Sequence, residues 1–320
     1  GPGMSATIPT PSTPVDQGPA EARLLAQAER AGLADIATKV LAGTRLSPDD
    51  GLRLYASPDL FAVGALANHV RERLHGDATY FNVNQHVNYT NLCNRLCKFC
   101  AFQRLPSQEG AYVWTPEEAA ERIKEQLDEP VTEVHVVGGV WPKLDYAYYL
   151  DLLRAIKAAR PAIHIKGFTA VEIHYYAEKY GMSVQEVLEH LRAAGLDSMP
   201  GGGAEIFADR ARKKLCADKV SADNWLEVHR VAHAMGFRTN ATMLFGSIET
   251  LEERVDHLVR LRELQDETGG FQTFIPLKFH NDNNRLAKLA EPTELDCLLT
   301  LAISRLMLDN FAHIKAYWPM

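Results

Sequence analysis

The sequence is poor in cysteine, in basic residues relative to acidic ones, and in long apolar runs, and each shortage excludes a class of protein. Five cysteines in 320 residues are too few for the disulfide framework of a small secreted protein. No apolar run approaches the roughly 20 residues that cross a bilayer, and no charged-then-apolar leader opens the chain, so we expect a cytoplasmic protein. A net charge of −7 argues against a broad surface for nucleic acid or anionic membranes, while leaving room for a local basic pocket.

Three of the five cysteines are clustered. Cys93, Cys97 and Cys100 are spaced C-x3-C-x2-C, so one loop can turn all three thiolates towards one metal centre. A structural zinc site takes four ligands, whereas a [4Fe–4S] cluster held by three cysteines leaves one iron free to bind a small chelating ligand. The spacing therefore favours a cluster. Two alternatives stay open, which are zinc with His86 as the fourth ligand and three unconnected thiols.

The chain divides into three stretches by composition and periodicity. Residues 1–20 are rich in Pro, Gly, Ser and Thr, which predicts a disordered tail that begins with a tag remnant, Gly1-Pro2-Gly3. Residues 21–76 carry apolar side chains at helical spacing and a strong helix start at Ser47-Pro48, which predicts an N-terminal helical cap. From residue 77 to residue 320, strand and helix patterns alternate.

The alternating stretch predicts a parallel sheet with helices outside it. Six β-α units with short connections indicate an α/β fold, a partial (β/α)6 TIM-like barrel, with a doubly wound open sheet as the alternative. In such barrels the loops after the strands carry the active site. The expected strands are 80–84, 133–137, 163–169, 196–199, 238–245, 271–279 and 313–318; the expected helices are one opening at 115, 145–160, two stretches up to 195, 222–235, 250–269 and 293–310.

Several further residues lie where a barrel of this kind would use them. Gly138-Gly139 and residues 200–204 permit close backbone approach to a ligand or form plain turns, and no Walker lysine follows them to make a nucleotide P-loop. Glu205 is either a ligand-binding carboxylate in the mouth of the barrel or a helix-start acid. The remaining expectations are His135 and His280 in the interior, His229 and His233 on the surface, Arg305 and Lys315 as cations for carboxylates, and Cys216 and Cys297 as buried small side chains.

The cysteine pattern resembles that of the radical S-adenosylmethionine (SAM) enzymes, because Phe99 completes their signature C-x3-C-x-aromatic-C. The resemblance implies that the three cysteines are the catalytic and metal-binding residues, that their cluster chelates SAM, and that Phe99 lies beside the adenine. Val140 departs from the family's pattern, which often has an acid there. The SAM-binding candidates are Phe99, Gly138, Gly139, Glu205 and, in a stretch similar to the adenine motif, Thr242, Met243 and Leu244, with Glu249 fixing the loop.

Longer strings resemble one branch of that superfamily, the aminofutalosine synthases. They include residues 132–139, 197–206, 261–271 and 313–320, and the resemblance covers nearly everything from Ala65 onwards. It implies a transferase of menaquinone biosynthesis that adds the 5′-deoxyadenosyl radical of SAM to 3-[(1-carboxyvinyl)oxy]benzoate with loss of carbon dioxide, giving 6-amino-6-deoxyfutalosine. The related cyclic dehypoxanthine futalosine synthases share the glycine triplet but tend toward Gln where this chain has Val137.

The resemblance also implies partners. We expect SAM to be consumed as a co-substrate, a low-potential donor such as flavodoxin or ferredoxin to reduce the cluster, and a small dicarboxylate as substrate, with no nucleic acid or membrane. A zinc-binding interaction module is the alternative from another class. Members continue past the seventh strand whereas this sequence ends at Pro319-Met320, so we expect the lower lid of the site to be missing. Thr169 joins His135, His280 and Arg305 as a candidate substrate contact.

Overall fold

The computed structural model describes residues 18–317. The expected tag remnant and most of the expected tail lie outside the described residues, as does the end of the chain where the lower lid was expected to be missing. The first helix, α1 (Gly18–Arg30), begins inside the expected tail, so the predicted boundary at residue 20 is wrong. The reason is Pro19, which lacks an N–H but is tolerated in the first turn of a helix, where that N–H would have no intrahelical partner.

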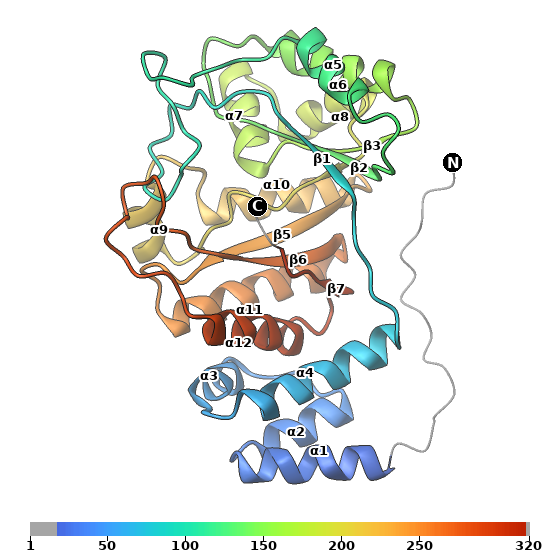
Figure 1. The fold of residues 1–320 in the computed structure, drawn as a ribbon, viewed down its shortest axis with the longest axis vertical. Helices are drawn as coiled ribbons and strands as arrows, with labels where there is room; N and C mark the ends of the chain where they lie inside the picture. The colour runs from blue at the N-terminus through green and yellow to red at the C-terminus, as the bar shows by residue number, and fades with distance from the viewer. Residues whose placement is uncertain (1–17, 318–320) are drawn as a thin grey trace.

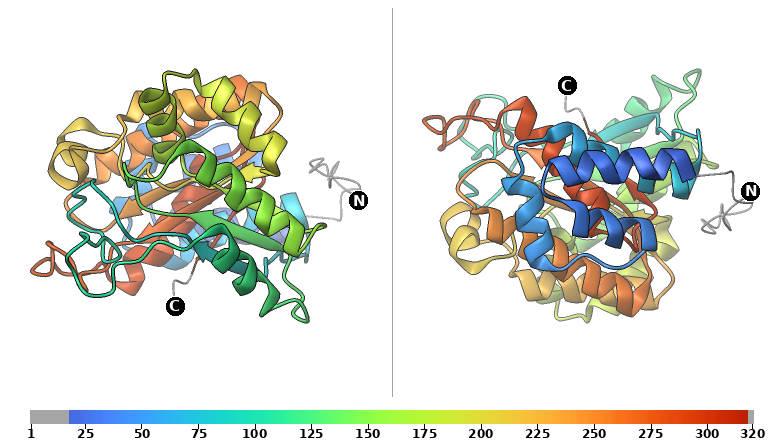
Figure 2. Two further views of the ribbon diagram at one scale, coloured as in Figure 1. Left: turned by 90° about the horizontal axis from the view of Figure 1, so that it is seen from above. Right: turned by 90° about the horizontal axis from the view of Figure 1, so that it is seen from below.

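Within the described residues the sheet has seven parallel strands in consecutive order, and helices cover its outer face (Figures 1 and 2). A doubly wound sheet reverses its strand order in the middle, so the consecutive order confirms the partial barrel and excludes that alternative. Among residues 18–317, no helix combines the length and the apolar character that crossing a bilayer requires. The strands are β1 (Asn84–Asn88), β2 (Glu133–Val137), β3 (His164–Gly167), β4 (Ser198–Met199), β5 (Arg238–Phe245), β6 (Phe271–Lys278) and β7 (His313–Ile314).

The helices of the barrel begin where the sequence places their caps. The predicted capping boxes at Thr115, Ser183 and Thr250 are confirmed, and each pairs a hydroxyl with the backbone N–H of a glutamate three residues on. Helix α9 was not predicted, because its sequence D-R-A-R-K-K-L-C is short and mostly charged, with only three apolar residues to mark its buried face. The helices are α5 (Pro116–Lys124), α6 (Tyr146–Ala159), α7 (Ala170–Tyr180), α8 (Val184–Ala194), α9 (Asp209–Cys216), α10 (Ala222–Ala234), α11 (Leu251–Thr268) and α12 (Glu294–Met307).

The first strand lies four residues later than the sequence suggests. Residues 80–84 were predicted as the strand, but Tyr80 and Phe81 are 63% and 83% exposed and do not belong to the sheet. The true strand is N-Q-H-V-N, in which Gln85 and Val87 are buried on the outer side. Its other face, which carries His86, is polar because it lines the inside of the barrel, so the strand has no apolar alternation of the usual strength.

The N-terminal helices pack on one side of the barrel. They are α1, α2 (Ala34–Ala42), α3 (Pro48–Ala56), whose predicted start at Ser47 is confirmed, and α4 (Leu60–His75). The Tyr55 hydroxyl donates to Thr300 Oγ1 of α12 at 3.0 Å, and Arg262 of α11 donates to the carbonyls of Leu46 and Met307 at 2.9 and 3.1 Å. Figure 1 shows these helices below α11 and α12, away from the loop that follows β1.

Candidate active site

The three clustered cysteines lie on the loop that follows β1, at the carboxyl end of the strands. Short bridges pair Thr90 with Val113 and Leu92 with Arg104, so both ends of the loop are tied to each other. Backbone hydrogen bonds then fix it from other elements, since the N–H of Lys98 donates to the carbonyl of Leu215 and its own carbonyl accepts from Arg285 N–H, both at 2.9 Å. The cysteine loop is therefore held in place by segments that come much later in the chain.

The environments of the cysteines suit metal-bound sulfur. Cys93 Sγ accepts backbone N–H groups from Arg95 and Val140, each at 3.4 Å, and such donors stabilise a thiolate. Burial raises the pKa of the Cys97 thiol to about 12, although the nearby Lys219 ammonium acts in the opposite direction. Cys97 is thus a protonated thiol at neutral pH until a metal displaces its proton.

The positions of the possible metal ligands bear on the alternative of a single zinc ion. In the part of the chain that the structure describes, no three His, Cys, Asp or Glu side chains lie close enough to hold one metal ion. A [4Fe–4S] cluster does not require its ligands to meet at one point, because each cysteine thiolate binds a different iron of the cluster. His86, the proposed fourth zinc ligand, instead lies against His135, with ring centroids 5.0 Å apart.

The glycine pair after β2 brings that strand into contact with the cysteine loop. A Cβ on Gly139 would lie 2.1 Å from the carbonyl oxygen of Leu92 and 2.9 Å from Cys93 Cβ, and one on Gly138 would lie 2.5 Å from the ring of Tyr89. The amides are also engaged, since Gly139 N–H donates to the carbonyl of Thr90 at 3.0 Å. These glycines therefore set the position of the loop through close approach.

Glu172 joins the ends of the first three strands, and the sequence analysis did not single it out. Its carboxylate is buried and accepts from Tyr89 Oη at 2.5 Å, Gly138 N–H at 3.0 Å and Thr169 N–H at 2.7 Å. Burial raises its pKa to about 7, against the hydrogen bonds from Tyr89, Thr169 and Gly138. Thr169, a candidate substrate contact, is the N-cap of α7 and forms a capping box with Glu172. The spacing T-x-x-E was the signal for this pair.

The glycine loop after β4 supports a buried ion pair. Glu205 has a φ of 48°, a left-handed conformation that is rare outside glycine and is concentrated at functional sites. Its carboxylate pairs with Lys219 Nζ at 2.9 Å, and that ammonium lies 5.2 Å from the ring centroid of Phe99. Burial is the largest influence on the pKa of Lys219 and lowers it, but the charge and hydrogen bond of Glu205, together with Cys97 and Cys216, raise that pKa overall. Phe99 and Glu205 are thus brought together, with Cys97 nearby.

The end of β5 lies beside this loop. Thr242 Oγ1 donates to the carbonyl of Gly201 at 2.6 Å, and Leu244 N–H donates to the carbonyl of Glu205 at 2.9 Å. Met243 is fully buried between them. The prediction that Glu249 fixes the following loop is confirmed, because its carboxylate accepts the backbone N–H of Gly246 at 2.5 Å and that of the next residue at 3.0 Å.

The candidate substrate residues do not form one group. His135 lies in β2 on the inner face of the barrel, whereas His280 lies after β6, half exposed, 3.5 Å from a carboxylate oxygen of Glu291. Arg305 is not at the strand ends, because it is buried and donates to the carbonyls of Leu308 and Phe311 at 2.7 and 2.6 Å. The Arg305 guanidinium thus donates to backbone carbonyls at the end of α12 and does not point to the mouth of the barrel, where it could have donated to a substrate.

Three expectations about isolated residues are resolved by packing. His229 is buried, with its ring 3.9 Å from that of Trp225, and His233 is partly buried, so their expected surface placement is wrong. Both rings point from α10 towards the sheet, and each forms a hydrogen bond with Thr239 Oγ1. This bond satisfies a ring nitrogen and so allows histidine at positions where apolar side chains are usual. Cys216 is buried as expected, whereas Cys297 is only partly so.

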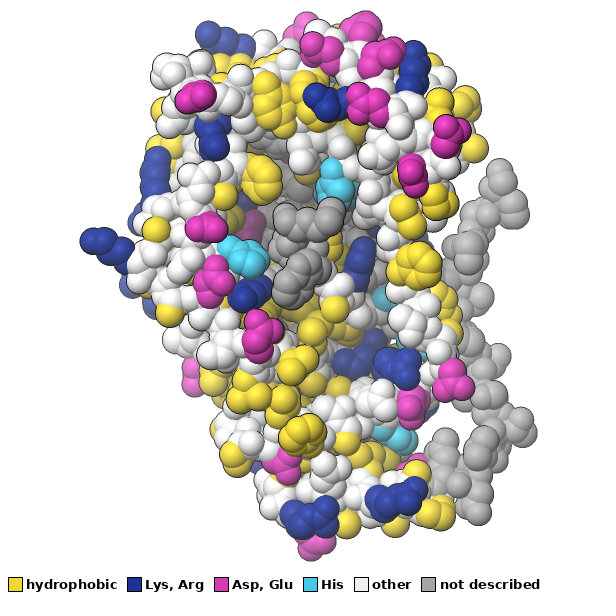
Figure 3. Space-filling model, viewed as in Figure 1, with side chains coloured by type: hydrophobic (Ala, Val, Ile, Leu, Met, Phe, Trp, Pro, Cys, Tyr) yellow, Lys and Arg dark blue, Asp and Glu magenta, His cyan; other side chains and the backbone are white. Residues whose placement is uncertain are grey.

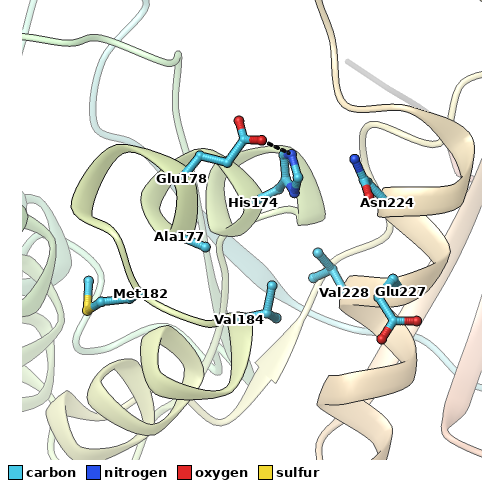
Figure 4. A pocket seen from close by; sticks show the side chains of 8 residues that line it. All are labelled: His174, Ala177, Glu178, Met182, Val184, Asn224, Glu227 and Val228. Carbon is cyan, nitrogen blue, oxygen red and sulfur yellow. Dashed lines mark ion pairs between the residues drawn. The ribbon is translucent and has the colours of Figure 1, made fainter.

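One surface pocket lies on the outer side of the barrel. It has a volume of about 260 Å³ and is formed by α7, α8 and α10 on the outside of the barrel (Figure 4). Its polar side chains include His174 and Glu178, which pair with each other at 3.2 Å, and Asn224. None of the predicted site residues lines it.

Comparison with known proteins places the chain in the same family by two routes, a family model and individual relatives. Residues 87–261 match the model of the radical SAM superfamily. The aminodeoxyfutalosine synthase of Thermus thermophilus is 53% identical over 89% of this chain and 78% of its own length, and that of Streptomyces coelicolor is 45% identical over 89% and 76%. The cyclic dehypoxanthine futalosine synthase of Halalkalibacterium halodurans is 40% identical over 88% and 77%.

Solved structures support the fold. Methylornithine synthase (PylB) superposes with a TM-score of 0.70 over 86% of this chain and 77% of its own, at 18% identity. The hydrogenase maturase HydG superposes with a TM-score of 0.73 over 95% and 68%, at 15% identity. At these identities the likeness concerns the architecture, and it agrees with the consecutive parallel strands described above.

Proposed function

The chain belongs to the radical SAM superfamily and, within it, to the aminodeoxyfutalosine synthase family, and from this premise we propose its reaction in detail. It adds the 5′-deoxyadenosyl group of SAM to the alkene of 3-[(1-carboxyvinyl)oxy]benzoate, and loss of carbon dioxide gives 6-amino-6-deoxyfutalosine for menaquinone biosynthesis. The observation that carries the proposal is the loop of three thiols fastened to the carboxyl end of β1 in a chain 53% identical to one such synthase.

Cys93, Cys97 and Cys100 would hold the [4Fe–4S] cluster. When bound, that cluster would supply the electron that splits the sulfonium of SAM. The chain's own task is to hold SAM and the alkene in reacting distance and to keep water away from them. Burial of Cys97 and closure of the loop by the segment around Arg285 serve this exclusion of water.

The SAM contacts that we propose surround the cysteine loop. The Lys219 ammonium lies over the ring of Phe99 and pairs with the carboxylate of Glu205. An aromatic face and a carboxylate therefore lie near the buried Cys97. Leu244 is bonded to the backbone of Glu205, which adds the end of β5 to the same group. The full set is Phe99, Gly138, Gly139, Glu205, Thr242, Met243 and Leu244, in which the glycines act by placing the loop and the others by lining the nucleotide.

The electron donor that we propose is a low-potential protein such as a flavodoxin or ferredoxin, acting in the cytoplasm. Supporting this, the cysteine loop carries exposed apolar side chains, with Leu96 42%, Phe102 76% and Leu105 43% exposed. Lys98 is also exposed on this loop. An apolar centre with a cation beside it suits transient contact with an acidic redox protein.

Anaerobic reconstitution with iron and sulfide tests the proposal. The expected result is a protein with the visible absorbance of an iron–sulfur cluster that, once reduced, converts SAM and the benzoate substrate into the adenosylated product, detected by mass spectrometry. A cyclic dehypoxanthine futalosine synthase would leave that substrate untouched and cleave SAM with its own substrate instead. A zinc-binding module would bind one zinc and no iron–sulfur cluster.

A further inference from the structure

The inner face of the barrel carries a row of polar side chains at one level. His86 of β1, His135 of β2 and Lys166 of β3 are neighbours in the parallel register, so they project to the same side of the sheet. The residues between them along each strand, such as Val87 and Ile165, are buried in the apolar layer under the helices. On the face drawn in Figure 3, histidine, lysine or arginine, and acidic side chains all lie around the middle of the barrel part of the molecule.

Two lysines lie near this row, Lys166 on β3 in the middle of the chain and Lys315 just after β7. Lys166 Nζ lies 3.1 Å from a carboxylate oxygen of Glu133, and both side chains are 9% exposed. Lys315, just after β7, donates to Asn82 Oδ1 at 3.1 Å. Burial lowers the pKa of Lys315, and the nearby charge of Lys166 lowers it further while Glu133 opposes the change. Lys166 is thus paired with a carboxylate, whereas Lys315 forms no ion pair within residues 18–317, so its ammonium adds a positive charge beside the Lys166–Glu133 pair in a protein whose net charge is −7.

Two polar atoms, one in this row and one in the next pair on the same face towards the amino ends of the strands, have no hydrogen-bond partner within the described residues. His135 Nδ1 and Asn84 Oδ1 are buried without a hydrogen bond. Burial, with the charges of His86, Lys166 and Lys315, lowers the pKa of His135 to about 3, so this imidazole is neutral and has one N–H to donate. A buried group that lacks a partner costs free energy, and a bound ligand removes that cost.

We propose that Lys166 and Lys315 bind the ring carboxylate of the benzoate substrate, with neutral His135 as a hydrogen-bonding neighbour. The inference rests on the proposed function and assigns residues to one end of its substrate. His135 precedes Gly138 by three residues, about 10 Å along the strand, and Gly138 is beside the cysteine loop. The alkene must lie near that loop, so the carboxylate reaching this depth is the one on the ring, which the reaction retains, and not the one lost as carbon dioxide.

Two ligands separate this subsite from a structural role of the lysines. Reconstituted protein with SAM but without reductant is used for equilibrium dialysis, first with 3-[(1-carboxyvinyl)oxy]benzoate and then with 2-phenoxyacrylate, which lacks only the ring carboxylate. We expect Lys166→Gln and Lys315→Gln each to weaken binding of the benzoate by about 10- to 100-fold, the range for a lost hydrogen bond to a charged group. Binding of 2-phenoxyacrylate is expected to change by less than about threefold.

Controls keep the outcomes apart. Lys157→Gln removes a lysine that pairs with Asp197 at 2.7 Å outside the barrel, and it should bind both ligands as the unaltered protein does. Equal weakening of both ligands by the barrel variants, or none, would overturn the subsite. If Lys166→Gln does not fold, the partly buried Lys315 carries the test alone. Unaltered, reduced protein that made no 6-amino-6-deoxyfutalosine would refute the proposed function separately, whatever the lysines bind.

Discussion

Glu172 is the most informative residue to perturb, because one buried carboxylate joins the ends of three strands. Its pKa is raised from 4.5 to about 7 by burial, despite the hydrogen bonds from Tyr89, Thr169 and Gly138. An acid whose folded pKa exceeds its unfolded pKa contributes stability that is complete below the unfolded value and is lost as the pH rises through the folded value. Ionisation of Glu172 should therefore cost about 3 kcal/mol of unfolding free energy between about pH 4.5 and pH 7.

Glu172→Gln removes this titration while keeping the shape of the side chain. Its amide oxygen can accept from Tyr89 and Gly138, but its NH2 would face Thr169 N–H, a loss of about 1 to 3 kcal/mol that does not vary with pH. We expect the stability of the unaltered protein relative to the variant to fall by about 3 kcal/mol from pH 4.5 to pH 7.5. Urea midpoints at a series of pH values, measured anaerobically, give this difference.

The exposed Glu189 of α8 offers a matched control, since Glu189→Gln removes a carboxylate that is not buried. Its stability curve should follow that of the unaltered protein at every pH. Parallel curves for the unaltered protein and Glu172→Gln would refute the reasoning, because they would mean that Glu172 titrates alike in the folded and unfolded chain.

Two further predictions concern the cysteine loop. Gly139→Ala would place a Cβ 2.1 Å from the Leu92 carbonyl, so we expect the loop to move and the iron content after reconstitution to fall at least severalfold, whereas Gly64→Ala, which meets nothing within 4 Å, should retain it. An iron content unchanged in both variants would contradict the close-approach argument. Lys219→Met leaves the Glu205 carboxylate buried without its partner, so we expect a loss of about 3 kcal/mol or more of unfolding free energy. We also expect weaker SAM binding, measured by equilibrium dialysis. A SAM affinity equal to that of the unaltered protein would show that this pair does not belong to the nucleotide site.

Much of the scaffold was predictable because local signals agreed with the global fold. β2 and β5 occupy the predicted residues, and helices start at the predicted caps, since a hydroxyl–glutamate box satisfies backbone donors whatever the tertiary context. β1 was misplaced because the inside of this barrel is polar, so the strand facing it lacks apolar alternation while the exposed Tyr80 and Phe81 imitate it.

Only part of the site could be predicted from the sequence, because some of its residues are close in the sequence and others meet only in the fold. The cysteines are close in sequence, and their spacing carries their chemistry. Glu172, by contrast, looked like an ordinary capping acid, and its contacts to Tyr89 and Gly138 span 83 and 34 residues. Lys166 and Lys315 are 149 residues apart in sequence and lie near each other because β3 and β7 line one barrel. Contacts of this range follow from the curled sheet of the partial barrel and leave no local pattern.

Individual removal of the cysteines, with Cys216 as the control, tests the central claim most directly. Cys216 is buried beside Cys97, so Cys216→Ala changes a thiol of similar surroundings that lies outside the loop. After anaerobic reconstitution, we predict that Cys93→Ala, Cys97→Ala and Cys100→Ala each lose the [4Fe–4S] cluster and all formation of 6-amino-6-deoxyfutalosine, while Cys216→Ala retains both. A loop-cysteine variant that kept full cluster content and product formation would contradict the account.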